Sequence, residues 1–166
     1  MTLDAVDVRE GRVLRLNWEL GLCEHGELTG WADALIARLD NPPYALTEIS
    51  MAHALESSPR SMEALLGGDY TVDEIVVALA RVNPDLIALK PLCDALGMVA
   101  NMAMGFERDT VARNHPTLGL LHDAFQVHDG YYYLGLGETS EAALRRDVSD
   151  YFRRIRDAAA KVEVTS

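Results

Sequence analysis

Apolar residues recur with a helical period along most of this chain, and the C-terminal segment shows the period best. Over residues 139–162 the apolar positions form a single stripe at helical spacing. They are Leu144, Val148, Tyr151, Phe152, Ile155, Ala159 and Val162. This pattern predicts a long helix that packs the stripe on the core. A second apolar segment, the methionine-rich run over residues 92–104, predicts a buried helix.

Proline and glycine mark the ends of shorter helices. Asn41-Pro42-Pro43 and Ser58-Pro59 have the form of helix starts, because a proline nitrogen needs no partner in the first turn. Asn41 is a suitable capping residue for the first of them. Gly67-Gly68 predicts the end of the helix that begins at Pro59.

Capping signals predict two further helices. Thr71 and Glu74 have the spacing of a capping box, so a helix should begin there and end before Asn83-Pro84. Asn114-His115-Pro116 predicts another start, and Gly130 predicts the end of that helix.

Two segments fit more than one secondary structure. Between Leu14 and Leu22 every second residue is apolar, which is the period of a strand. Arg15 and Glu19, however, have the spacing of a helical charge pair, and we favour a short helix there. For the run of aromatic residues near 130–136 we expect an extended segment instead.

These elements predict an all-α fold. A chain of 166 residues fits one domain, and neither a repeat nor a linker divides it. We therefore expect a single helical domain over residues 1–166. It should be an irregular bundle of about seven or eight helices, packed around the helix at 92–104 and the C-terminal helix.

Charge adds a bias toward certain partners. The formal net charge is −11, with 26 acidic against 15 basic side chains. Before residue 111 the acidic residues outnumber the basic ones by more than two to one, and between Glu19 and Glu56 the only basic residue is Arg38. Repulsion disfavours nucleic acid and anionic membranes, so we expect a basic protein as the partner.

The cysteines and the chain start indicate a compartment. Cys23 and Cys93 are the only two cysteines, and two isolated thiols are typical of a reducing environment. The first ten residues carry acids where a signal peptide has a basic region followed by an apolar core. The longest weakly polar run, over residues 96–106, is too short to span a bilayer. We expect a cytoplasmic protein.

Five histidines in an acidic chain raise the question of a metal site. His115, His122 and His128 lie close in sequence, with Asp123 and Asp129 beside two of them. No metal-binding motif accompanies them, and on one helix they would not share a face. We interpret them as surface or helix-end residues and expect no metal and no cofactor.

An acid–base enzyme is the alternative from another class. Asp33, Glu48 and His53 could approach one another, and a carboxylate in the apolar segment around Glu48 would have a raised pKa. The His115–Asp129 region offers a metal-dependent version of the same idea. Nucleophile motifs and phosphate-binding glycine loops are absent, so we assign no catalytic residue. A structural or regulatory subunit is a third possibility.

Four short segments carry a resemblance to known proteins. They are Trp18-Glu-Leu-Gly-Leu, Gly30-Trp-Ala-Asp-Ala-Leu-Ile36, Pro42-Pro-Tyr44 and Glu48-Ile-Ser50. Together they are similar to a pattern in small bacterial helical proteins, some of which resemble immunity proteins of polymorphic toxin systems. The resemblance implies a helical domain that neutralises a toxin by binding it, and it brings no catalytic residues.

Charge and resemblance together predict a partner-binding surface in the first part of the chain. Its residues are Glu19, Glu24, Glu27, Trp31, Asp33, Asp40 and Tyr44. The acids would steer a basic partner toward this surface, which would then occlude the partner's own site. Trp31 and Tyr44 would be anchors if their rings are exposed, because aromatic residues dominate interface energetics.

Overall fold

The computed structural model describes residues 3–52 and 59–165, and every regular element in these ranges is a helix. The prediction of an all-α fold is confirmed. Contacts between residues divide the chain into two compact units. Unit 1 comprises Met1–Glu19 and Cys23–Tyr70, and unit 2 comprises Leu20–Leu22 and Thr71–Ser166. The expectation of a single domain over residues 1–166 stays a prediction.

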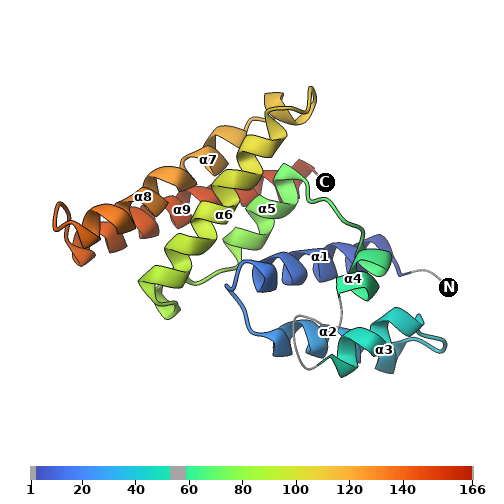
Figure 1. The fold of residues 1–166 in the computed structure, drawn as a ribbon. Helices are drawn as coiled ribbons and strands as arrows, with labels where there is room; N and C mark the ends of the chain where they lie inside the picture. Colours follow the sequence, from blue (N-terminus) through green and yellow to red (C-terminus); the bar gives the residue numbers. More distant parts are fainter. Residues whose placement is uncertain (1–2, 53–58, 166) are drawn as a thin grey trace. The chain divides into compact units, whose positions relative to one another are not determined.

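Unit 1 contains four helices, α1 (Ala5–Glu19), α2 (His25–Arg38), α3 (Tyr44–Met51) and α4 (Pro59–Leu66) (Figure 1). Helix α1 packs on α2 and α4, and α3 packs on the same two helices. The buried core of the unit is formed by Trp18, Leu28, Ala32, Leu35, Leu46, Ile49 and Met62. Since α1 includes residues 14–19, the favoured helical interpretation of that part of the segment is confirmed.

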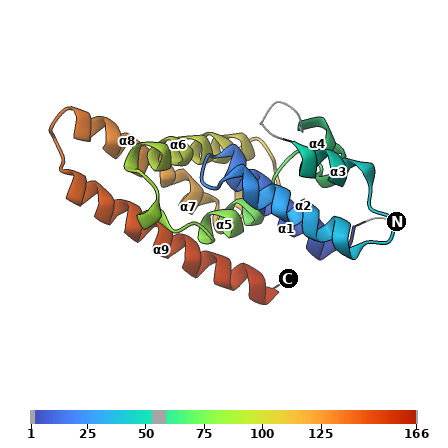
Figure 2. The same ribbon diagram turned by 90° about the horizontal axis from the view of Figure 1, so that it is seen from below.

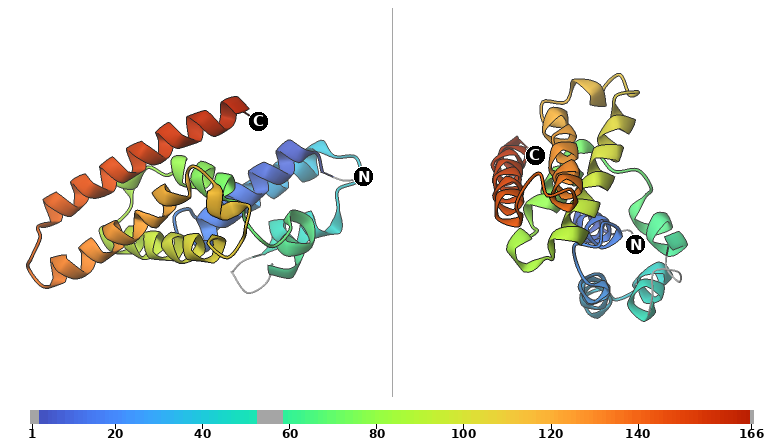
Figure 3. Two further views of the ribbon diagram at one scale, coloured as in Figure 1. Left: turned by 90° about the horizontal axis from the view of Figure 1, so that it is seen from above. Right: turned by 60° about the vertical axis from the view of Figure 1, so that its left-hand side comes forward.

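Unit 2 is built from five α-helices and two short 3₁₀ turns among its described residues (Figures 1 and 2). They are α5 (Val72–Ala80), η1 (Pro84–Leu86), α6 (Leu89–Phe106), η2 (Ala112–Asn114), α7 (Leu118–His122), α8 (Ala124–Gly135) and α9 (Glu141–Thr165). Helix α9 packs on α5 and α8, and α6 packs on α7 and α8 (Figure 3). This arrangement places α8 between α6 and α9.

Several helix boundaries follow the predicted capping signals. The Thr71 hydroxyl accepts from the Glu74 backbone N–H, and the Glu74 carboxylate accepts from the Thr71 N–H, which completes the capping box. Helix α4 ends at Leu66, and Gly67 follows with a positive φ of 79°. The apolar stripe predicted for the C-terminal helix is buried throughout.

Three predicted boundaries were wrong. Residues 131–135 are helical rather than extended, because α8 continues through Gly130 and ends at Gly135. A Cβ at Gly130 would lie 2.7 Å from Leu144 Cδ1, so this glycine permits close packing on α9. The helix stops where Gly137 adopts a positive φ and Glu138 N–H donates to the Tyr133 carbonyl.

The other two errors concern helix starts that contain proline. Helix α3 begins at Tyr44 with Pro43 in the capping position and no side-chain cap, so Asn41 does not cap it. After Asn114 the chain leaves the 3₁₀ turn η2, and α7 begins only at Leu118. His115, the residue before Pro116, is held in an extended conformation, which delays the start of α7.

No helix in the described part of the chain is both long enough and apolar enough to cross a membrane.

Candidate functional site

The negative charge is unevenly divided between the two units. Unit 1 carries 12 acidic and 5 basic side chains, and unit 2 carries 14 and 10. The excess of acidic residues predicted for the first part of the chain therefore lies mainly in unit 1. We consider first where this unit places the predicted partner-binding residues.

Helix α2 and the turn that follows it present most of these residues to solvent. Glu24 precedes the first turn of α2 and makes no side-chain cap, while Glu27 and Asp33 are exposed on the helix. Asp40 is exposed in the turn, and the Tyr44 ring at the start of α3 is 76% exposed. These five residues form what we name the α2 surface.

The carboxylates of the α2 surface are largely unneutralised. No hydrogen bond or ion pair within the described ranges involves the side chains of Glu24, Glu27 or Asp40. Asp33 accepts a hydrogen bond from the Ser50 hydroxyl, which links α2 to α3 without neutralising the charge. The surface therefore keeps its negative charge available to a partner.

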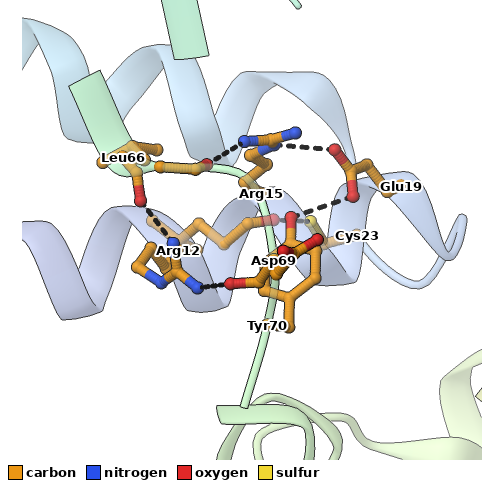
Figure 4. Close-up of polar contacts among 9 residues, drawn as sticks. Arg12, Arg15, Glu19, Cys23, Leu66, Asp69 and Tyr70 are labelled. Carbon is orange, nitrogen blue, oxygen red and sulfur yellow. Dashed lines mark hydrogen bonds and ion pairs between the residues drawn. The ribbon is translucent and has the colours of Figure 1, made fainter. Parts of the chain in front are cut away.

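Glu19 is committed to contacts within unit 1 instead (Figure 4). Its carboxylate accepts from Arg15 Nε at 2.7 Å and from the Tyr70 hydroxyl at 2.9 Å. The guanidinium groups of Arg12 and Arg15 lie 5.3 and 5.8 Å from the centre of the Tyr70 ring. Burial and the neighbouring Glu19 carboxylate both raise the pKa of Tyr70. This cluster attaches the segment after α4 to α1.

The Tyr70 cluster also engages two of the unit's arginines. Arg12 donates to the carbonyl oxygens of Leu66 and Asp69, and Arg15 donates to that of Gly67 at 2.8 Å (Figure 4). A third arginine, Arg38, pairs with Asp7 on α1. Each of these three arginines therefore already has a partner within unit 1, and that partner is not a residue of the α2 surface.

Trp31 is not an exposed anchor. Its side chain is partly buried and packs against the core of unit 1. The ring lies so close to Gly11 that a Cβ there would stand 2.5 Å from the Trp31 Cζ2 atom. Gly11 is thus the residue that lets α1 approach the indole, and Trp31 contributes to the core.

The two carboxylates of the acid–base alternative have separate partners. Glu48 accepts a hydrogen bond from the Ser61 hydroxyl, whereas Asp33 accepts from Ser50. No hydrogen bond in the described ranges joins the two carboxylates. His53 and Glu56 lie outside the described residues.

The three clustered histidines also have separate partners. His115 Nε2 lies 3.2 Å from Asp73 Oδ1, and His122 Nε2 lies 3.3 Å from Glu107 Oε1. His128 Nδ1 donates to the Cys93 carbonyl at 2.9 Å. Over residues 3–52 and 59–165, no group of three or more His, Cys, Asp or Glu side chains is placed to hold a metal ion.

One of these histidines, His115, lines a pocket in unit 2. The pocket has a volume of about 530 Å³ and lies between α9 and the residues around the start of α7. The Thr117 hydroxyl donates to His115 Nδ1 at 2.8 Å, and Asp73 faces the other ring nitrogen. The histidine is held in place by both contacts, and its Nδ1 is already occupied as an acceptor.

Sequence reasoning missed an exposed aromatic surface on α8. Phe125, Tyr132 and Leu136 are 51%, 66% and 55% exposed, and Tyr133 is beside them. Spacings of seven and four residues place the first three on one side of the helix. That spacing was visible in the sequence, but the expectation of an extended segment at 130–136 concealed it.

Comparisons of the chain with protein-family models, with curated proteins and with solved structures found no match.

Proposed function

We propose that this protein is an acidic, cytoplasmic protein-binding module of the immunity type, which binds a basic toxin and occludes its site. The observation that carries the proposal is the α2 surface, which combines exposed carboxylates that have no cation partner among the described residues with an exposed tyrosine. Neither nucleic acid nor a membrane surface is the expected partner, since both carry negative charge.

The expected mechanism has two steps. The field of Glu24, Glu27, Asp33 and Asp40 attracts the basic partner and raises the rate of encounter. Tyr44 then supplies apolar contact area and a hydroxyl at little entropic cost, as aromatic residues do at interface hot spots. Charge in this scheme governs the association rate, and the aromatic contact governs the lifetime of the complex.

The test begins with a partner chosen by gene position. A toxin encoded beside this chain is co-expressed with it, and rescue of growth is scored. Binding of the two purified proteins is then followed by surface plasmon resonance over a series of salt concentrations. We expect rescue, and an association rate that falls as salt screens the acidic surface. Absence of binding and of rescue would refute the immunity proposal.

Matched variants locate the surface. The neutralised variant Glu24→Gln, Glu27→Gln, Asp40→Asn should lower the association rate about tenfold at low salt. A control variant, Glu63→Gln, Asp85→Asn, Glu138→Gln, removes equal charge from exposed positions elsewhere. Equal effects of the two variants would show that only net charge matters, and the α2 surface would be rejected.

The aromatic surface on α8 is the competing contact site. Tyr44→Ala should accelerate dissociation, whereas Phe125→Ala and Tyr132→Ala should leave it unchanged if the α2 surface binds the partner. The reverse result would keep the protein-binding function and transfer the interface to α8.

A further inference from the structure

A second pocket in unit 2, with a volume of about 340 Å³, lies between α8 and α9. Figure 3 shows these two helices side by side and joined at one end. The pocket is lined by Asp123, Gln126, Val127, Asp147, Asp150, Tyr151 and Arg154. Five of these seven residues carry a charge or an amide, so the lining is mostly polar.

Tyr151 contributes a buried polar group without a partner. The residue is 2% exposed, and its hydroxyl makes no hydrogen bond within the described part of the chain. Burial raises the pKa of Tyr151, the charge of Asp123 raises it further, and the charge of Arg154 opposes this change. Tyr151, Asp123 and Arg154 all line this pocket. A buried hydroxyl without a partner is uncommon and destabilising unless a ligand satisfies it.

The charges around the pocket leave one carboxylate unmatched. Arg154 forms an ion pair with Asp123. Asp150 Oδ1 lies 3.1 Å from Arg153 Nη2, and both side chains are largely exposed. Asp147 is exposed, and no ion pair or hydrogen bond in the described ranges involves its side chain. The lining therefore has room for one additional positive charge.

The ligand groups and the volume of the pocket favour an organic cation over a metal ion. The carboxylates belong to no group of three among the described residues that could hold a metal. A pocket of this volume is at the lower end of the range for small-molecule sites. A ligand with several N–H donors can bond to a carboxylate and to a phenolic oxygen at the same time.

We propose that the pocket between α8 and α9 binds a monovalent organic cation with N–H donors, an alkylammonium or a guanidinium group. The cation donates to the Tyr151 hydroxyl oxygen and pairs with Asp147, while the Asp123–Arg154 pair forms the adjoining wall. This proposal is independent of the proposed function, since the pocket lies in unit 2 and the α2 surface lies in unit 1.

The experiment uses the full chain and monovalent probes at constant ionic strength. n-Butylammonium and n-propylguanidinium supply N–H donors, and tetramethylammonium supplies the same charge without them. Isothermal titration calorimetry and the shift in melting temperature report binding. We expect both donor probes to bind and to raise the melting temperature, and tetramethylammonium to do neither. Equal effects of all three cations would overturn the proposal, because they would indicate screening alone.

Two variants separate binding from a structural role. Tyr151→Phe removes only the unpartnered hydroxyl, so without a probe its melting temperature should equal or exceed that of the parent protein. The same variant should weaken binding of the donor probes about tenfold or more, since a hydrogen bond to a charged group is lost. A clear loss of stability in Tyr151→Phe without a probe would show that the hydroxyl has another partner, and would overturn the proposal.

Asp147→Asn keeps the shape of the site and removes its unmatched charge. It should weaken the donor probes, whereas Glu138→Gln, at an exposed position outside the lining, should not. Equal weakening by both variants would contradict a specific site.

The cation could be a free amine or an arginine side chain of another protein. N-acetylarginine N-methylamide therefore serves as a third probe, because it presents the guanidinium on a blocked backbone. Binding of the small probes alone indicates a free ligand, and binding of the arginine derivative as well indicates a protein side chain. Failure of all donor probes to bind at the pocket overturns the proposal and leaves the immunity hypothesis untouched.

Discussion

Gly97→Ala is the most direct test of how α6 packs on α8. A Cβ at position 97 would lie 2.7 Å from His128 Nδ1 and 2.9 Å from His128 Cε1. The same nitrogen donates to the Cys93 carbonyl at 2.9 Å, one turn earlier on α6. The histidine ring cannot move away from the new methyl group without losing that hydrogen bond.

The expected magnitude follows from three contributions. Overpacking destabilises by about 1–3 kcal/mol, and loss of the hydrogen bond removes about 0.5–1.5 kcal/mol. The higher helix propensity of alanine offsets about 1 kcal/mol of this. We expect Gly97→Ala to lower the free energy of unfolding by about 1–3 kcal/mol. Gly105→Ala is the matched control on the same helix, because a Cβ there meets nothing within 4 Å.

The assay is urea denaturation followed by circular dichroism. Gly105→Ala should be neutral or slightly stabilising. His128→Ala removes the obstructing ring, so adding Gly97→Ala to that background should raise stability rather than lower it. Gly97→Ala could leave the free energy of unfolding unchanged, or could lower it equally in the parent and in the His128→Ala background. Either result would show that contact between the new methyl group and the His128 ring does not destabilise the protein, and would refute the reasoning.

Two further predictions concern α1 packing and a buried thiol. Gly11→Ala should destabilise the protein by about 1–3 kcal/mol through its contact with Trp31. Gly30→Ala, with nothing within 4 Å of the new Cβ, should stabilise it by about 0.5–1 kcal/mol. Changes of the same sign in the free energy of unfolding, measured by denaturation of the two variants, would contradict this prediction. Burial raises the pKa of Cys93 from its ordinary value of 9.0 to about 11. The pKa of this thiol is higher in the folded than in the unfolded state. Its contribution to the free energy of unfolding should therefore be fully present below pH 9 and decline as the pH rises toward 11. Cys93→Ala should reduce the slope of the free energy of unfolding against pH in this range. An unchanged slope would show that Cys93 does not contribute to the pH dependence of stability.

Local sequence signals predicted much of the fold because they act over a few residues. The capping box at Thr71 and the stop at Gly67 need only their neighbours along the chain. The apolar stripe of α9 likewise depends on spacing within one helix. Gly130 shows the limit of such signals, since its role is decided by Leu144 on another helix and not by any turn.

The candidate sites depended on tertiary structure to different degrees. Exposed acids on α2 could be predicted, because carboxylates are rarely buried without a partner. The hydrogen bond from the Tyr70 hydroxyl to Glu19 could not be predicted. The two residues are 51 positions apart and meet only when α1 and the segment after α4 pack together.

By itself, then, the sequence determined the helical class, several helix boundaries and the acidic bias of the first unit, all of which arise from composition and short-range periodicity. Only the tertiary structure decided which carboxylates remain unpaired and that Trp31 packs against the core. It also brought Tyr151 and Asp123 to one pocket. Pairing, burial and pocket formation depend on contacts between distant segments, and no local pattern encodes those distances.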